Sequence, residues 1–331
     1  MVCRKHTAHQ RGPTVLHQRE PMKSLIDMSQ AIFDRQLLLM RRTRIATEIK
    51  SAEFLLRRAA EDIIARLQSI TREFPLALNL GSHHGVLSDI LRDDDRVETV
   101  LSGDPCMAMV VQCSGIKLVC DEEALPFKAG CLDLVVSGLS LHHVNDLPGA
   151  LVQIRRALKP DGLLLGAILG GQTLKELRFA LARAEEEIDG GVSPRVAPFA
   201  DVRDCGGLLQ RAGFALPVTD ADSVEVTYGS MFDLMRDIRA MGASNVLLER
   251  RRQPLKRSVF LRAAEIYSEN FSVSEGRITA TFETIHLTGW APDASQPKPL
   301  KPGSAKARLA DALNTDELST GEKADPFDNS P

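Results

Sequence analysis

The sequence predicts an α/β fold built on a mostly parallel β-sheet. Three observations lead to this prediction: short apolar segments of strand length recur, amphipathic helical segments separate them, and each apolar segment ends in glycine or a polar residue. These ends are Gly81, Asp104, Asp121 and Ser137, so they lie 23, 17 and 16 residues apart. The carboxyl ends of parallel strands meet at one edge of a sheet, and α/β proteins bind their ligands there.

The first predicted strand, Phe74–Leu80, runs into a turn that reads Gly-Ser-His-His-Gly. Glycine lets main-chain N–H groups approach a ligand where a Cβ atom would collide. A dinucleotide loop requires Gly-x-Gly-x-x-Gly, but the second and third positions counted from Gly81 are His83 and Val86. S-adenosylmethionine has no pyrophosphate and needs a less close approach, so the turn suits it better. The residues of this segment predicted to contact the cofactor are Asn79, Gly81, Ser82 and Gly85.

The next strands end in residues that complete a cofactor site. Asp104 follows the glycine turn by about 20 positions, where a carboxylate can accept both ribose hydroxyls, and this role is compatible with starting the Asp-Pro turn. Asp121 and Glu122 are predicted to accept from the adenine amino group, and Ser137 is the last predicted contact. This ordered series predicts a class I S-adenosylmethionine-dependent methyltransferase fold, which is Rossmann-like, with a mostly parallel seven-stranded sheet and helical additions.

The loop after the fourth strand carries the candidates for contact with the reacting group, His142 and Asn145. These two residues could equally well form the turn and cap the following helix. An iron site of two histidines and one carboxylate would have to combine one histidine from each adjacent pair, since neighbouring residues in an extended loop point apart. Because that arrangement and the seven-residue cysteine spacing both fit metal ligation poorly, no metal is predicted.

Helical periodicity before the first strand, at Leu56, Ala60, Ile63, Ile64 and Leu67, predicts an N-terminal helical segment. Its arginines are predicted to occupy the solvated face: Arg41, Arg42, Arg44, Arg57 and Arg58.

Beyond the fourth strand the pattern continues with alternating helices and strands. Thr173 is the predicted N-cap of a helix, and residues 190–199 are predicted to lie over the crevice as a lid. The basic segment 248–257 is interpreted as a solvated connection in preference to a docking site for an acidic partner. The remaining elements are expected as helices over 147–158, 201–212 and 231–241, and strands over 162–169, from 214 and over 281–289.

Composition agrees with a globular protein of this class. The chain has 331 residues, 44% hydrophobic and 26% charged, and its net charge of −3 argues against a general nucleic-acid binder. No apolar run approaches the roughly 18 residues of a membrane span. The predicted organisation is a disordered or targeting tail (1–30), a helical segment (31–72), a methyltransferase-like domain (73–290) with insertions at 173–212 and 231–270, and a proline-rich, then acidic tail (291–331).

Several blocks of the sequence resemble the mitochondrial complex I assembly factor 5 family and its bacterial relatives. The resemblance covers about Ile32 to Leu313 and is more distant for the malonyl-carrier-protein methyltransferase of biotin synthesis. The blocks include Ile-Phe-Asp-Arg from residue 32, Asp-Glu-Glu-x-Leu-Pro-Phe from 121, Leu-Ser-Leu-His-x-Val-Asn-Asp-Leu-Pro from 139, and Gly-Gly-x-Thr-Leu-x-Glu-Leu-Arg from 170.

The resemblance implies an S-adenosylmethionine-binding enzyme that modifies an arginine by hydroxylation. The implied partner is the complex I subunit that carries an iron–sulfur cluster near the quinone site, which would bring the protein to the membrane surface. The implied location is the mitochondrial matrix in a eukaryote, or the cytoplasm in a bacterium. The chain departs from the family's glycine loop at His83 and from its usual aspartate at Asn79. A small-molecule methyltransferase and a non-catalytic assembly chaperone remain the alternatives.

Overall fold

A computed structural model describes residues 31–297 and 309–316 of the chain. The chain divides into two compact units, Met1–Pro292 and Asp293–Pro331, and the short helix α10 (Leu309–Leu313) belongs to the second. The predicted N-terminal tail (1–30) and most of the predicted C-terminal tail lie outside the described residues.

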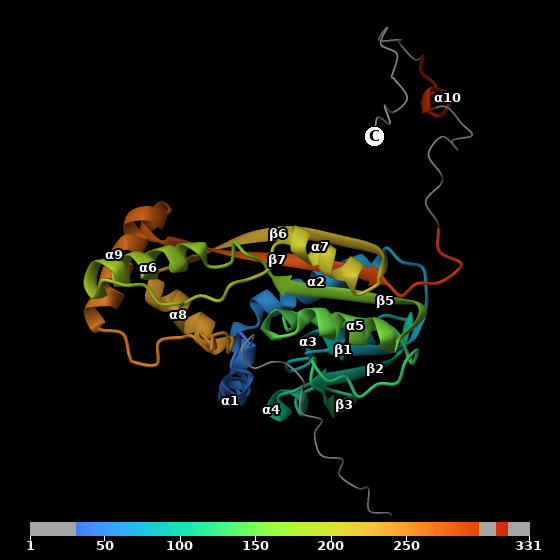
Figure 1. Cartoon of the computed structure of the whole chain (residues 1–331), viewed down its shortest axis with the longest axis horizontal. Helices are drawn as coiled ribbons and strands as arrows, with labels where there is room; N and C mark the ends of the chain where they lie inside the picture. Colours follow the sequence, from blue (N-terminus) through green and yellow to red (C-terminus); the bar gives the residue numbers. More distant parts are fainter. Residues whose placement is uncertain (1–30, 298–308, 317–331) are drawn as a thin grey trace, which may run out of the picture. The chain divides into compact units, whose positions relative to one another are not determined.

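The first unit is built on a seven-stranded sheet with the order β3-β2-β1-β4-β5-β7-β6 (Figure 1). Pairing is parallel from β3 to β5, whereas β7 is antiparallel to both β5 and β6. The strand order reverses between β1 and β4, so the predicted glycine turn opens at the switch point of the sheet. The strands are β1 (Phe74–Leu80), β2 (Val97–Asp104), β3 (Ile116–Val119), β4 (Leu132–Gly138), β5 (Leu158–Leu169), β6 (Ala215–Tyr228) and β7 (Ile278–Trp290).

Both faces of the sheet are covered, because alternate residues of its central strands enter two separate hydrophobic clusters. Ala77 of β1 packs with α2 (Phe54–Gln68), and the next residue, Leu78, packs with α5 (Leu147–Ala157) on the other side. Every residue of β4 is buried, as expected for a central parallel strand. The other covering helices are α3 (Val86–Arg92) on the first face and α7 (Val202–Arg211) on the second.

The insertions form a helical group at one end of the sheet, seen on the left in Figure 1. It consists of α6 (Lys175–Asp189), α8 (Met231–Ala240) and α9 (Arg257–Phe271). The predicted N-cap of α6 is wrong: the helix begins after Leu174, which has φ 54°. Thr173 Oγ1 donates instead to the backbone carbonyl of Glu283 in β7 at 3.1 Å. The hydroxyl is therefore used by the neighbouring strand and does not cap the helix.

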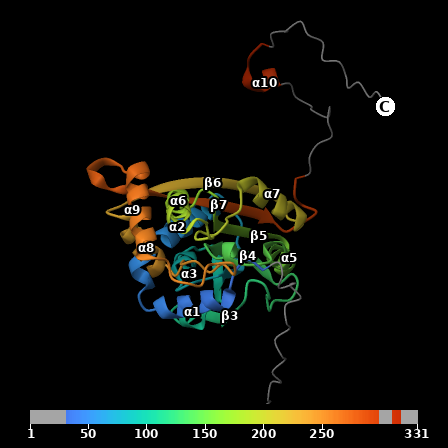
Figure 2. The ribbon, with the colours of Figure 1, turned by 60° about the vertical axis from the view of Figure 1, so that its left-hand side comes forward.

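The N-terminal segment contains α1 (Arg35–Ile45) and the short turn η2 (Ile49–Ala52), ahead of α2. The side chain of Asp34 caps α1 by accepting from the N–H of Leu37 at 3.0 Å. α1 packs against α4 (Met107–Val110), which follows β2, and Figure 2 shows it beside the β3 edge. One expectation for this segment is wrong: Arg42 is only 4% exposed, since its helix face is turned toward the carboxyl ends of the strands.

Candidate functional site

The glycine turn after β1 has the backbone conformation that its sequence predicts. Gly81 has φ 70° and Gly85 has φ 102°, both in the left-handed region that favours glycine. A Cβ atom on Gly81 would lie 2.1 Å from the Cβ of Ser140, so this glycine also allows the loop after β4 to come close. The turn brings Ser82 into a 3.5 Å contact with the thiol of Cys113.

Asp104 lies at the centre of the edge formed by β1 and β2, and its side chain is fully buried. Its carboxylate accepts from the backbone N–H of His83 at 2.9 Å and of Cys106 at 2.8 Å. Burial raises the pKa of Asp104 to about 6, with Arg42 lowering it and Glu122 raising it. A carboxylate has about four lone-pair positions, so Asp104 keeps acceptor capacity for a ligand hydroxyl.

His83 occupies the position where a third glycine was expected. It adopts φ 49°, and its Nε2 lies 3.1 Å from the carbonyl oxygen of Gly138 at the end of β4. The carbonyl only accepts, so Nε2 carries the proton and donates. Burial lowers the pKa of His83 well below its usual range, and nearby Arg42 lowers it further. The ring is therefore neutral and covers part of the edge between β1 and β4.

The acidic residues after β3 meet a cation from α1. Arg35 forms ion pairs with Asp121 at 2.9 Å, Glu122 at 2.6 Å and Glu123 at 2.8 Å. Glu122 is buried and also accepts from the hydroxyl of Ser140 at 2.5 Å. The two acids predicted to contact adenine therefore lie together at the expected edge, with α1 closing over them.

Asn145, predicted to contact the reacting group, binds the chain that precedes α1. Its Oδ1 accepts from the backbone N–H groups of Ile32 at 2.9 Å and Phe33 at 2.8 Å, and its Nδ2 donates to the Phe33 carbonyl at 3.2 Å. This triple hydrogen bond fixes the entry to α1. The catalytic assignment of Asn145 stays a prediction, and its amide is engaged elsewhere in this structure.

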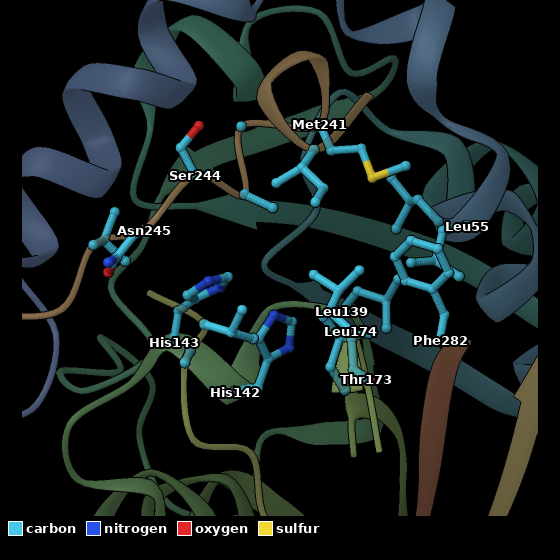
Figure 3. A pocket seen from close by; sticks show the side chains of 18 of the residues that line it. Leu55, Leu139, His142, His143, Thr173, Leu174, Met241, Ser244, Asn245 and Phe282 are labelled. Atoms are coloured by element: carbon cyan, nitrogen blue, oxygen red, sulfur yellow. The ribbon is translucent and has the colours of Figure 1, made fainter. Parts of the chain in front are cut away.

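A pocket of about 1100 Å³, solvent at its mouth included, opens beside His83 and is lined by His142 and His143. Figure 3 shows these two rings on one side of the pocket and Leu55 and Phe282 on the other. The two histidines do not point apart as expected for an extended loop. They belong to the turn η3 (Leu141–His143), which places their ring centroids 4.2 Å apart.

Both pocket histidines are neutral. Burial lowers the pKa of His142 to about 3 and that of His143 well below its usual range, with Arg42 adding to each shift. Their Nδ1 atoms have no hydrogen-bond partner among the described residues. The predicted lid segment also reaches the pocket, where Phe199 packs edge-on to the His142 ring with centroids 5.8 Å apart. The role of residues 190–199 as a lid stays a prediction.

The remaining predicted contacts are at the switch point with part of their hydrogen-bonding capacity unused. Asn79 donates to the hydroxyl of Ser88 at 2.8 Å, while its Oδ1 is buried without a partner in the described part of the chain. Ser137 Oγ is likewise buried and unpartnered among those residues. Within the described ranges, no group of three or more His, Cys, Asp and Glu side chains is placed to hold a metal ion.

Sequence reasoning missed three residues that shape the site. Arg42 was expected on the solvated face, yet it lines the pocket. Arg35 had no predicted role, and it pairs with the acids after β3. Glu53, just before α2, also lines the pocket and accepts from His84 at 2.6 Å. The only available signal was the Ile-Phe-Asp-Arg block from residue 32, which has no helical or strand periodicity.

The sheet order, the glycine turn and the acids after β2 and β3 define a class I methyltransferase fold. A methyltransferase-domain family model matches residues 78–166. The chain is 39% identical to the arginine-hydroxylase NDUFAF5, mitochondrial, of Mus musculus, and the alignment covers 88% of this chain and 87% of the relative. It is 40% identical to the protein of the same name from Homo sapiens, and that alignment covers 83% of this chain and 81% of the relative. The chain belongs to the NDUFAF5 family.

The chain also has more distant similarities. The malonyl-[acyl-carrier protein] O-methyltransferase of Methylovorus sp. is 34% identical over 76% of this chain and 87% of that protein. A solved structure of a putative methyltransferase from Bacillus halodurans aligns with TM-score 0.49 at 15% identity, covering 70% of this chain and all of that one. No helix among the described residues is long and apolar enough to cross a membrane.

Proposed function

We propose that this chain binds S-adenosylmethionine at the β1, β2 and β4 edge and hydroxylates an arginine side chain of a protein during assembly of respiratory complex I. One observation carries the proposal: relatives named arginine-hydroxylase share 39% and 40% identity with this chain over 88% and 83% of its length. Two carrier-protein methyltransferases share 34% and 29% identity over 76% and 80% of this chain, and a third shares 40% over only 56% of it.

The residues at the edge fit the cofactor. Gly81 and Gly85 give the turn its left-handed backbone conformation, and Asp104 retains acceptor capacity for the ribose hydroxyls. The unpartnered oxygens of Asn79 and Ser137 supply further polar contacts in the same edge. When bound, this cofactor carries an electrophilic methyl group on a sulfonium. α1 pairs with the acids after β3 and covers the place proposed for the adenosine half of the cofactor. This helix must therefore move before the cofactor can enter.

The pocket fits an arginine side chain. Apolar side chains such as Leu55, Leu174 and Phe282 surround it and match the aliphatic stem. A guanidinium has five N–H donors and no acceptor, and each neutral imidazole has one unprotonated nitrogen that accepts. His142 and His143 present two such rings side by side, so they are suited to orient a guanidinium without placing a charge next to it.

Hydroxylation breaks one C–H bond of the arginine and forms C–O and O–H bonds. One atom of dioxygen enters the product, and the other leaves as water with two electrons and two protons from an external reductant. The protein's own residues bind and orient the side chain, and the apolar walls of the pocket limit the access of water to it.

The decisive experiment is mass spectrometry of the iron–sulfur subunit near the quinone site of complex I, from wild-type and deletion strains. A gain of one oxygen at a single arginine, lost on deletion, is the expected result. A gain of one methylene instead indicates methyl transfer. An unmodified subunit with normal complex I, together with a biotin requirement, assigns the chain to carrier-protein methylation.

An assembly chaperone without catalysis makes a different prediction. In that case complex I assembly fails on deletion, but no arginine of the subunit changes mass in the wild type. We propose the matrix as the location in a eukaryote and the cytoplasmic face of the inner membrane in a bacterium, following the partner. Fractionation together with the iron–sulfur subunit tests this.

A further inference from the structure

A second groove opens beside the site pocket, between α1, α6, α8 and α9. Its floor is apolar, with Leu177, Met235 and Phe260 among the residues that line it. Four arginines line it as well, Arg41, Arg44, Arg195 and Arg239, and no aspartate or glutamate is among the lining residues. We call this surface the arginine groove. Its charge is opposite in sign to the net charge of −3 of the whole chain.

Most of the positive charge in the arginine groove is not neutralised by the protein. Arg44 and Arg239 are exposed and form no ion pair with any residue that the structure describes. Arg41 donates to the backbone carbonyl of Asn245 at 2.6 Å, which leaves its charge uncompensated by a carboxylate. Arg195 is the exception, because it pairs with the buried Glu185 at 2.5 Å.

Like charges are crowded around the groove. Burial lowers the pKa of Arg41, and the neighbouring charges of Arg250 and Arg44 lower it further, while Asp34 acts in the opposite direction. The basic segment 248–257 is partly satisfied within the protein, since Arg251 and Lys256 both pair with Asp189. Three arginines without a carboxylate partner among the described residues, Arg41, Arg44 and Arg239, therefore lie together in the groove, where an anionic partner would relieve their repulsion.

The arginine groove is continuous with the site pocket. Six residues line both, Leu177, Arg195, Ile238, Gly242, Ser244 and Asn245. A chain that places one side chain in the pocket must therefore lay its adjoining residues along the groove or over its rim. The apolar floor and the cationic rim match a segment in which acidic and apolar residues alternate.

We propose that the arginine groove docks the segment of the protein substrate that flanks the modified arginine, and that this segment is rich in acidic and apolar residues. The proposal rests on the proposed function, because it takes the occupant of the pocket to be a substrate arginine. Residues 1–19 of this chain are unsuitable occupants, since they carry basic residues and no acid. The acidic C-terminal residues 315–331 are the competing occupant and are tested below.

The test measures the binding of fluorescent synthetic peptides to the full chain by anisotropy. Each peptide has one arginine flanked by aspartate, glutamate and leucine, and matched peptides carry glutamine in place of the acids. The acidic peptide is expected to bind about tenfold more tightly than the glutamine peptide, with affinity falling as salt rises. The double variant Arg44→Glu, Arg239→Glu is expected to lose about tenfold in affinity for the acidic peptide.

The matched control is the double variant Arg203→Glu, Arg211→Glu on α7. Both control residues are exposed, and the net charge changes by the same amount. Figures 1 and 2 show α7 at the other end of the unit from α8 and α9. The control is expected to bind the acidic peptide as the wild type does. Equal losses in the two double variants would show a general charge effect and overturn the proposal.

Two further outcomes separate the groove from the proposed function. If the wild type modifies its arginine and the groove variant does so with unchanged KM, the docking proposal is wrong and the function stands. If the acidic peptide binds in a groove-dependent way but no arginine is modified, docking of an acidic segment stands and the hydroxylase function fails. A synthetic peptide of residues 315–331 that binds the groove more tightly than the acidic peptide would assign the groove to the chain's own tail.

Discussion

His83 is the residue at which this chain departs most from the glycine loop of its class. The sequence identifies the departure, but it does not reveal where the ring goes. The structure places the ring over the Gly138 carbonyl with a backbone φ of 49°, a conformation that costs an L-residue roughly 1–2 kcal/mol. The loop therefore keeps a glycine-like backbone at a residue that is not glycine, and the ring occupies the space beside the end of β4. If the cofactor binds as proposed, its methionine half passes this ring.

Replacing His83 with glycine is expected to tighten the binding of S-adenosylhomocysteine by several-fold. Glycine removes the ring from the crevice and relieves the left-handed backbone, and the emptied space is open to the ligand. Isothermal titration calorimetry measures the affinity. The comparison variant is Ser82→Gly, which keeps the ring in place. A weaker affinity for the His83 variant would mean that the ring contacts the cofactor instead of obstructing it.

The charged form of Asp104 is expected to lower the stability of the fold while it strengthens ligand binding. Its pKa is raised from 3.8 to about 6 because the carboxylate is buried, so folding favours the protonated form. Stability from this group is complete below about pH 4 and is lost as pH rises through 6. At neutral pH, Asp104→Asn is therefore expected to raise the free energy of unfolding by about 1–2 kcal/mol. Urea unfolding at pH 7 and pH 4.5 measures the gain, which shrinks at the lower pH.

The same Asp104→Asn substitution is expected to weaken binding of S-adenosylhomocysteine by about tenfold, because hydrogen bonds from the ribose hydroxyls to a charged acceptor are lost. In the wild type the affinity falls as pH drops below about 6, where the carboxyl takes up a proton, and the variant lacks this dependence. A variant that is neither more stable nor weaker in binding would contradict both halves of this argument.

For single residues, the sequence predicted the backbone conformation of the glycine turn well. It did not predict where charged side chains are buried. Gly81 and Gly85 could be placed because the left-handed backbone conformation of a tight turn favours glycine. Arg42 was placed on the solvated face because helical periodicity treats arginine as exposed. Its burial depends on acids and histidines that are distant in sequence, such as Asp104 and His142, and no local pattern reports them.

At the scale of elements, α1 is tied to the acids that follow β3 and to the loop after β4. Arg35 holds its first turn to three acids after β3, and Asn145 holds the two residues before it. These contacts join segments about 90 and 110 residues apart in the chain, so they can break without unfolding the sheet. We therefore expect that α1 opens on loss of these contacts while the rest of the site stays in place.

Arg35→Ala is expected to loosen α1 selectively. The substitution leaves Glu122 buried without its cation, so residues 35–45 should exchange amide hydrogen about tenfold or more faster, while β1 and β4 stay protected. Stopped-flow measurements should show faster dissociation of S-adenosylhomocysteine. Arg58→Ala, which breaks an exposed pair with Asp222, is the matched control and should change neither rate. Uniform loss of protection would mean that Arg35 supports the whole unit.

The order of the elements could be predicted because apolar residues recur with a different period in strands and in helices. The start of β1 at Phe74 and the end of β2 at Asp104 agree with the sequence, as do the ends of α5 and α7 within one residue. The start of α6 was missed because Thr173 bonds to β7, which follows it by more than 100 residues. An N-cap is predicted from residues that are close in sequence. Here an acceptor that is distant in sequence takes the hydrogen bond of the predicted cap.

At the scale of the whole unit, the site forms where three parts of the chain meet: the switch point of the sheet, the helix α1 and the inserted helices α6 and α8. The rules of α/β topology predict the first of these, since strand order fixes the edge at which ligands bind. The other two depend on how insertions pack, and packing of distant segments leaves no periodic signal. The pocket and the arginine groove were therefore visible only in the structure.

Ligand binding at this junction should stabilise the unit as a whole. At a hundredfold excess over its Kd, S-adenosylhomocysteine adds about 2.7 kcal/mol to the free energy of unfolding, or about 5–10 °C in Tm for a unit of this size. At the same ligand concentration, Asp104→Asn should gain only about half of that stabilisation, because its tenfold weaker affinity leaves a tenfold excess. Its Tm without ligand should nevertheless be higher than that of the wild type, since the buried charge is gone. Differential scanning fluorimetry of both proteins, with and without ligand, measures all four values. Equal shifts in the two proteins would place the cofactor away from Asp104.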